Sequence, residues 1–411
     1  MHRVRQVFPA VVECDVETRI AQLYSGSQLA AAGERVAIGV GSRGISNYSR
    51  IVKGAIAQFR KLGAEPFLVP AMGSHGGATP EGQLKVLAGH GITEESHGVP
   101  IHAEMDAENV GQTKSGMDVW FSKAALSADR IFVINRIKPH TDFSGDIGSG
   151  CLKMLTVGMG KHVGAANYHQ NAVRIGYAEA LKGLGDAILS NLPIAGGLGI
   201  IEGQRHETVS LELLEPEDWI TREEELVLKV KSGLPKIPLE DIDLLVVDQI
   251  GKNFSGTGMD SNVIGRGVHS YSTLTGREHT NPPHIRRIYV RDLAPETNGN
   301  AIGLGLADFV HQRVVDQMDV NVTYTNALTA LSLNACKVPI TMSDERQVVE
   351  LALRSVGALS DPSARILRIA NTLDLEFFDV SDGLLSDVGD NSKCERLPVS
   401  YPIEDWRSLT D

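Results

Sequence analysis

The hydrophobic positions of the first 140 residues alternate between short β-branched runs and stretches with helical spacing. The spacing of apolar residues over 47–63, which ends at a glycine, predicts an amphipathic helix. Thr79 followed by Pro80 predicts the N-cap and the first position of another helix. Strands are predicted for three short apolar runs, at 34–41, 65–71 and 129–135. This alternation favours an α/β fold with a largely parallel sheet, in which ligands bind at the carboxyl ends of the strands.

The pattern changes character at 214–240, where a charged helix is followed by a linker that contains glycine and proline. Before this stretch, we predict one long amphipathic helix over 171–189 and a strand over 196–203. We therefore place a domain boundary near 235. The chain is expected to form two α/β domains, over 1–235 and 236–411.

The second domain is predicted to open with an apolar strand over 242–250. The glycine-rich stretch 255–266 predicts a structured loop rather than a helix. Further elements are expected as helices near 301–315 and 344–355 and as a β-rich run over 366–380. The polar tail after about 384 is predicted to be irregular.

Composition sets limits on function. The 411 residues are 42% hydrophobic and 22% charged, which is typical of a globular protein of two or three domains. A net charge of −12 argues against binding to nucleic acid. The four cysteines form no CxxC pair, which argues against a zinc ribbon or a disulfide framework. No run approaches the roughly 18 apolar residues of a membrane span, so we expect a cytoplasmic protein.

Reactive side chains follow several of the predicted strands. Arg43 lies in a Gly-Ser-Arg-Gly turn, where a guanidinium group can grip a planar anion in bidentate fashion. Glycines on both sides of His75 clear space for a ligand. Gln249 and Lys252 place an amide and an ammonium after the first strand of the second domain. The plainer alternatives are a surface ion pair for Arg43, a histidine bonded within its turn, and a solvated loop.

The segment 135–170 carries the richest chemistry. It places His140, Lys153 and His169 around a glycine-rich turn that follows an apolar strand. Imidazole can move protons or bind a metal near neutral pH. A lysine can bind an anion or carry a covalent cofactor. An ordinary surface lysine and a hydrogen-bonded core histidine are the plainer readings of Lys153 and His169.

Small residues fill the turn of this segment. Ser144 and Gly145, with Gly148, Ser149 and Gly150, can offer backbone N–H groups to a phosphate at the start of a helix. The turn contains no Gly-Lys-Ser/Thr and no GxGxxG, so it is neither a P-loop nor a dinucleotide fingerprint.

Taken in order, these motifs resemble the lactate racemase family, which comprises the nickel-pincer-nucleotide-dependent racemases and epimerases of 2-hydroxy acids. The resemblance rests on the arginine turn, Gly-Ser-His-Gly, Lys-Pro-His with Phe-Ser-Gly, Lys153 and His169. It is strongest over 40–205 and weaker over 240–266. It implies a two-domain α/β protein with its active site in the cleft between the domains.

Carried over by position, the resemblance implies how a cofactor would be held. Lys153 would carry the nickel complex of pyridinium-3-thioamide-5-thiocarboxylate mononucleotide through a thioamide link. His169 would ligate nickel beside the sulfur and carbon donors of the pincer. Ser144 and Gly145 would contact the same cofactor.

The resemblance also implies how a small 2-hydroxy acid would react. His75 and His140 would exchange protons with the substrate, one on each face. A hydride would move to and from the cofactor, which inverts the configuration at C2. Arg43, Gln249 and Lys252 would bind and orient the substrate carboxylate.

The chain departs from the family pattern in its predicted pocket. The arginine turn lacks the Asp, Thr and Pro of lactate racemases proper, and Gly76 stands where an arginine is usual. The segment from His140 to Lys153 is a few residues longer, whereas the spacing from Lys153 to His169 fits. We therefore expect a substrate larger than lactate, such as a sugar acid or a dicarboxylate.

Two other classes of function compete with this interpretation. His75, His140 and His169 could instead bind a hydrolytic zinc, since such sites use three protein ligands and keep one position open. The same scaffold could also be a non-catalytic nucleotide or metabolite binder. The sequence does not indicate an oligomeric state.

Overall fold

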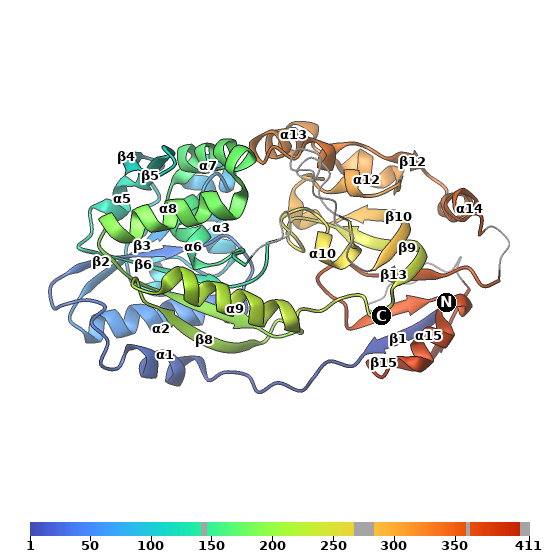
Figure 1. The fold of residues 1–411 in the computed structure, drawn as a ribbon, viewed down its shortest axis with the longest axis horizontal. Helices are drawn as coiled ribbons and strands as arrows, with labels where there is room; N and C mark the ends of the chain where they lie inside the picture. Colours follow the sequence, from blue (N-terminus) through green and yellow to red (C-terminus); the bar gives the residue numbers. More distant parts are fainter. Residues whose placement is uncertain (141–145, 267–282, 359–361, 403–411) are drawn as a thin grey trace. The chain divides into compact units, whose positions relative to one another are not determined.

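The computed structural model describes residues 1–140, 146–266, 283–358 and 362–402 (Figure 1). The chain forms two compact units, which divide between Leu234 and Pro235. The N-terminal unit begins at Val11. Met1–Ala10 belongs to the C-terminal unit, although the sequence places it in the first domain.

A five-stranded sheet with the order β3-β2-β6-β7-β8 organises the N-terminal unit. The first four strands are parallel, and β8 runs antiparallel to β7. The strands are β2 Arg35–Val40, β3 Glu65–Pro70, β6 Arg130–Arg136, β7 Ile194–Glu202 and β8 Thr208–Leu214. All four runs predicted as strands in this unit are confirmed. The chain passes from β2 to β3 on one side and returns to β6 on the other, so the carboxyl ends of β2 and β6 form a topological switch point.

Helices cover both faces of this sheet (Figure 1). The predicted amphipathic helix is α2, and Phe59 from it meets Tyr24 and Phe132 edge to face in the core. Thr79 caps α3 by accepting a hydrogen bond from the Gly82 N–H, as predicted. The helices are α1 Val16–Tyr24, α2 Tyr48–Lys61, α3 Pro80–Gly89, α4 Glu94–His97, α5 Lys123–Leu126, α6 Cys151–Lys153, α7 Lys161–Ile175, α8 Tyr177–Asn191 and α9 Trp219–Gly233, and a hairpin adds β4 Ala107–Gln112 and β5 Asp118–Ser122.

The single helix predicted over 171–189 is wrong. The chain forms two helices, α7 and α8, which meet at Gly176. This glycine has a φ of 97°, which residues with a Cβ rarely adopt. Helical spacing of apolar residues continues through the break, so periodicity alone does not reveal it.

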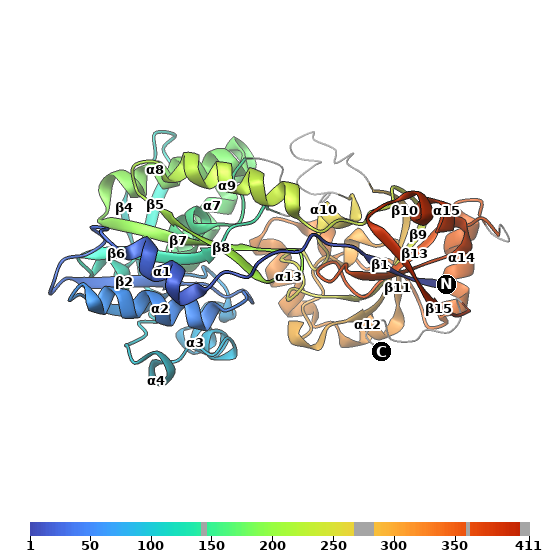
Figure 2. The ribbon, with the colours of Figure 1, turned by 90° about the horizontal axis from the view of Figure 1, so that it is seen from below.

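An eight-stranded sheet with the order β12-β11-β10-β9-β13-β14-β1-β15 organises the C-terminal unit. Its strands are parallel from β12 to β13 and antiparallel from there to β15. Strand β1 lies between β14 and β15 (Figure 2). The strands are β1 His2–Gln6, β9 Asp241–Ile250, β10 His284–Leu293, β11 Phe309–His311, β12 Ile340–Met342, β13 Ile366–Ile369, β14 Phe377–Val380 and β15 Cys394–Ser400.

Two predictions for this unit are wrong. In place of a helix near 301–315, the chain forms a 3₁₀ turn, the strand β11 and the start of α12 Gln312–Gln317. The stretch after 384 forms α15 Leu385–Asp390 and β15 rather than an irregular tail. Near 301–315, short apolar runs do not distinguish strand from helix, whereas the polar residues after 384 give no periodic signal for the elements they form.

Other predictions for this unit are confirmed. The helix expected near 344–355 is α14 Glu345–Ser355, and the β-rich run forms β13 and β14. The loop over 255–266 contains only the four-residue helix α10 Ser261–Ile264, and α13 Val320–Thr329 completes the described helices of more than six residues. Within the described ranges, every helix is too short or too polar to cross a membrane.

Candidate active site

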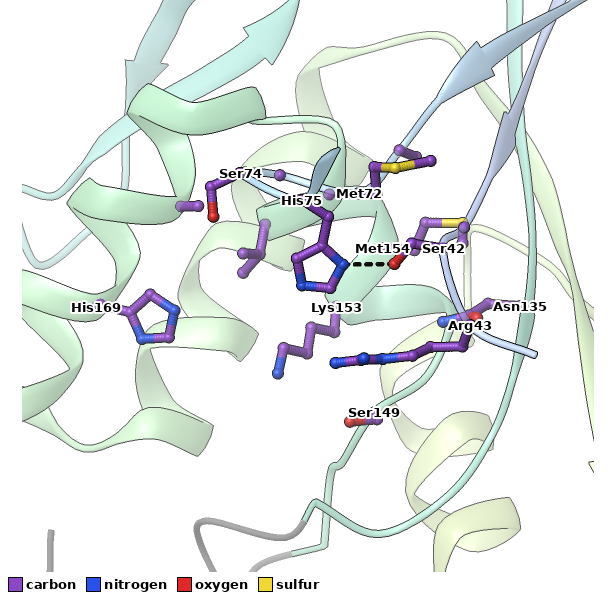
Figure 3. A pocket seen from close by; sticks show the side chains of 16 residues that line it. Ser42, Arg43, Met72, Ser74, His75, Asn135, Ser149, Lys153, Met154 and His169 are labelled. Atoms are coloured by element: carbon purple, nitrogen blue, oxygen red, sulfur yellow. Dashed lines mark hydrogen bonds between the residues drawn. The ribbon is translucent and has the colours of Figure 1, made fainter. Parts of the chain in front are cut away.

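A pocket opens at the carboxyl ends of the strands around the switch point of the N-terminal sheet (Figure 3). Its walls are residues 41–43 after β2, residues 71–75 after β3, and Asn135 at the end of β6. Lys153 and His169 enter from the helical segment that follows β6. Four of the predicted site residues therefore meet in one cavity: Arg43, His75, Lys153 and His169.

A tyrosine fixes the start of the first wall. The Gly41 N–H donates to the Tyr48 hydroxyl over 2.6 Å, and this hydroxyl donates to the Ile134 carbonyl over 2.9 Å. Because Ile134 belongs to β6, the hydroxyl ties the ends of two neighbouring strands together. Arg43 follows this hydrogen-bonded position by two residues, and its side chain reaches into the pocket beside Lys153 (Figure 3).

A buried glutamine fixes the loop that carries His75. Gln83 donates from its amide to the Gly73 carbonyl over 3.0 Å and to the His75 carbonyl over 3.2 Å. Gly76 has a φ of 65°, and a Cβ there would lie 2.5 Å from the Gly82 backbone. Gly76 thus allows this loop to pack against the start of α3, a role that differs from the space for a ligand that the sequence pattern predicts.

The imidazole of His75 is oriented by a serine that the sequence analysis did not single out. The Nδ1 of His75 lies 2.5 Å from the Ser42 Oγ (Figure 3). The Ser42 carbonyl in turn lies 3.1 Å from the Nε2 of His90. A hydrogen bond at Nδ1 sets the orientation of an imidazole. The position of Ser42 in a strand-end glycine turn was the signal that could have identified it.

The loop after β6 closes as a narrow antiparallel bridge. Lys138 and Ser149 exchange both backbone hydrogen bonds, over 2.9 and 2.8 Å. A Cβ at Gly148 would lie 2.3 Å from the Lys138 carbonyl oxygen, so only glycine allows this approach. The Ser149 N–H is used within the bridge and is not offered to a phosphate. Ser144 and Gly145, predicted to contact a cofactor, lie outside the described residues.

His140 does not line the pocket but contacts a residue that does. Its Nε2 lies 2.5 Å from the Lys153 Nζ, and only 9% of the residue is exposed. Burial, followed by the nearby Lys153 and His169, holds the pKa of His140 well below its ordinary value. The imidazole is therefore neutral near pH 7, and its Nε2 can accept a hydrogen bond from the lysine ammonium.

His169 has an unusual environment for a histidine. Its Nδ1 is buried and has no hydrogen-bond partner in the described part of the chain. Burial, with a smaller contribution from Lys153, lowers the pKa of His169 to about 4. The rings of Tyr168 and Tyr177 pack against the imidazole. A neutral imidazole with an unused ring nitrogen is the form in which histidine binds a metal.

A second lysine of the same segment is fully buried. Lys161 donates to the Pro70 carbonyl over 3.0 Å, at the end of β3. Burial lowers the pKa of Lys161 to about 8. This contact joins the loop that carries His75 to the helix that carries His169. It was not predicted, because no sequence spacing marks it.

The predicted carboxylate-binding pair belongs to the C-terminal unit. Gln249 is the penultimate residue of β9, and Lys252 follows the strand. The Lys252 ammonium donates to the Asn326 side-chain oxygen over 2.6 Å, and the Asn300 amide donates to the same oxygen over 3.0 Å. The role of this pair in binding substrate stays a prediction.

The three-histidine zinc site, considered as an alternative, is not formed in the described part of the chain. Within the described ranges, no three histidine, cysteine or carboxylate side chains are grouped so that they could hold a metal ion. His75, His140 and His169 therefore do not provide the three ligands of a hydrolytic zinc site. A metal that uses His169 would need most of its donors from a cofactor.

Comparison with known proteins agrees with the fold. Residues 24–178 match the lactate racemase N-terminal domain family. The lactate racemase apoprotein of Thermoanaerobacterium thermosaccharolyticum superimposes with a TM-score of 0.52 at 14% identity, over 87% of this chain and 92% of that chain. A Thermotoga maritima protein of known structure gives a TM-score of 0.50 at 14% identity, over 85% and 92%. At such identities the likeness is one of fold. Among curated proteins, none matches by sequence.

Proposed function

We propose that this chain, whose residues 24–178 match the lactate racemase N-terminal domain family, is a racemase or epimerase that inverts the C2 configuration of a 2-hydroxy acid. The observation that carries this proposal is the meeting of Lys153, His169, Arg43 and His75 in one pocket. These side chains supply an amine, a metal-binding imidazole, an anion-binding guanidinium and a second imidazole at the switch point of the sheet.

The pocket residues fit the nickel-pincer nucleotide of the family. The unpartnered Nδ1 of His169 is a suitable nickel ligand, because its imidazole is neutral and makes no competing hydrogen bond within the described part of the chain. The Lys153 amine lines the same pocket and is suitable for covalent attachment. When bound, this group would supply an electron-poor centre that takes up and returns a hydride, and the chemistry of that transfer belongs to the cofactor.

The protein would then move protons and position the substrate. Inversion needs a proton site on each face of the substrate, and we assign these sites to His75 and His140. The His140 imidazole is neutral near pH 7 and its Nε2 lies 2.5 Å from the Lys153 Nζ, outside the pocket lining, so its assignment as a proton site rests on the family resemblance. His75, oriented by Ser42 at its Nδ1, lines the pocket and is assigned the proton site on the other face. General acid–base catalysis of this kind contributes about 10²–10⁴-fold to a rate.

Three polar groups would hold the substrate carboxylate. Arg43 reaches into the pocket and can bind it through two parallel hydrogen bonds. Gln249 and Lys252 of the C-terminal unit would complete the site, as the family resemblance implies. The arginine turn, which lacks the Asp, Thr and Pro of lactate racemases proper, favours a substrate larger than lactate, whereas Gly76 packs against Gly82 and does not line the pocket.

The test uses protein that is co-produced with the cofactor-making enzymes and a panel of lactate, sugar acids and dicarboxylic hydroxy acids. His75→Ala and His140→Ala should each abolish inversion, whereas His162→Ala, an exposed position on α7, should not. Full activity of both variants would remove the acid–base assignment. Binding of a hydroxy acid without turnover of any would instead favour the non-catalytic binder.

A further inference from the structure

A buried carboxylate lies behind the pocket, where the proposed chemistry does not use it. Glu223 on α9 is 0% exposed, and burial raises its pKa to about 7 despite hydrogen bonds from Leu152 and Trp219. A neutral residue at this place would avoid the cost of burying a carboxylate. The contacts of Glu223 indicate what this carboxylate does.

One carboxylate oxygen of Glu223 accepts two hydrogen bonds. The Leu152 N–H and the Trp219 indole N–H each donate to the Oε2 over 2.9 Å. The other oxygen, Oε1, has no hydrogen-bond partner within the described ranges. It lies against Gly150, where an added Cβ would be 1.9 Å away. Gly150 therefore lacks a side chain at the point where the carboxylate packs.

Leu152 lies in the first turn of the helical segment that carries Lys153. This segment runs from α6 into a π-helical stretch, Met154–Gly158, and its N-cap residue Gly150 has no side chain to cap it. Glu223 satisfies one of the N–H groups of this turn from a separate helix. A negative charge at a helix N-terminus is also favoured by the helix dipole.

We propose that Glu223 is a positioning residue for Lys153, and that its carboxylate fixes the first helical turn so that the lysine amine points into the pocket. The contact is made to the residue directly before Lys153, so a displaced turn would move the amine with it. Above pH 7, where Glu223 is ionised, its carboxylate holds the N–H groups of the turn more strongly than a neutral amide would, although burying the charge lowers the overall stability.

The inference rests on the proposed function for what Lys153 carries, but its test needs neither cofactor nor turnover. The purified protein is treated with pyridoxal 5′-phosphate, the imine is trapped with borohydride, and labelling is mapped by peptide mass. The measured quantity is the labelling rate of Lys153 divided by that of Lys229, an exposed lysine on α9. Glu223→Gln should lower this ratio by about tenfold, because a small misplacement of a reacting group costs much of its reactivity.

Glu225→Gln is the matched control, since Glu225 lies on the same helix but is exposed. It should leave the ratio unchanged. An unchanged ratio in a folded Glu223→Gln protein would overturn the proposal and leave Glu223 a purely structural residue. If labelling responds as expected but no hydroxy acid is inverted by loaded enzyme, the positioning role stands and the proposed function fails.

A second pair of variants keeps the proposal testable if Glu223→Gln does not fold. Gly150→Ala places a methyl group where the Oε1 lies and should displace the carboxylate, so it should lower the Lys153 ratio in the same way. The same change in a Glu223→Ala background should have no further effect, because the group that it displaces is already gone. Additive losses in the two backgrounds would overturn the proposal.

Discussion

Two polar side chains, Arg368 in the C-terminal unit and His169 in the N-terminal unit, are surrounded in opposite ways. Arg368 is 2% exposed and binds both oxygens of Asp248 over 2.9 Å, while it also donates to the Tyr401 hydroxyl over 3.0 Å. The Nδ1 of His169 is buried without a partner in the described part of the chain. Buried polar atoms are nearly always hydrogen-bonded, so an exception beside a pocket indicates function, whereas a fully paired charge indicates structure.

The largest effect on activity is expected from His169→Phe, which keeps the ring contacts with the neighbouring tyrosines. Loss of the nickel ligand should lower turnover by at least about 10⁴-fold, or ~5 kcal/mol of transition-state stabilisation. Stability should change little, since the ring nitrogen has no bond to lose. Nickel content and the thermal midpoint report the two quantities. Retained nickel at full stoichiometry would show that His169 is not the ligand.

The reverse outcome is expected for Arg368→Met. The variant removes two buried charge-assisted hydrogen bonds to Asp248, which keeps its ion pair with Arg291, so the free energy of unfolding should fall by about 3 kcal/mol. Chemical denaturation measures this loss. Adding Asp248→Leu should not restore the lost stability, because Arg291 then loses one of its two carboxylate partners and keeps Glu345. A double variant as stable as the native protein would contradict the pairing argument.

Glu223 is a second buried group with an unpaired polar atom in the described part of the chain, and the effect of pH on stability tests it. Its pKa is about 7 in the folded protein against an ordinary 4.5, so between these values the folded state binds the proton more tightly. Its contribution to stability is therefore present below pH 4.5 and is lost as the pH rises through 7. The loss is on the order of 3 kcal/mol.

Denaturation midpoints of the protein and of Glu223→Gln should be compared at several values between pH 4.5 and 8. The difference between the two proteins should grow in favour of the variant as the pH rises, because the amide has no proton to lose. A constant difference across this range would show that the Glu223 carboxyl titrates normally in the folded protein.

The smallest effect is expected at Ser42. Ser42→Ala removes the hydrogen bond at the Nδ1 of His75, and turnover should fall by about tenfold, or ~1.4 kcal/mol. Ser42→Thr keeps the hydroxyl and should retain most of the rate. Initial rates of the loaded enzyme over a pH series separate the two variants, and equal rates for both would remove the positioning role of Ser42.

The sequence was sufficient where local pattern decides the structure. The N-cap at Thr79, the helix α2 and the strands β2, β3 and β6 follow from spacing and turn chemistry alone. The rule that ligands bind at carboxyl ends of strands then placed Arg43 and His75 correctly in one pocket.

Local pattern was not sufficient where distant residues meet. Glu223 bonds to Leu152 across 71 residues of sequence, and no periodicity encodes such a contact. The turn at Gly176 was hidden by apolar spacing that continues through it. The short strand β11 was missed because a run of a few apolar residues suits either secondary structure, and β15 was missed because its residues are largely polar and exposed.

The central claim, inversion of a 2-hydroxy acid by hydride return, is tested most directly by isotope tracing. Protein co-produced with the cofactor-making enzymes is incubated in ²H₂O with the panel of 2-hydroxy acids. The inverted product should retain its original hydrogen at C2, because the hydride returns from the cofactor without mixing with solvent. Rapid incorporation of solvent deuterium at C2 would indicate an enolate mechanism and would contradict the account.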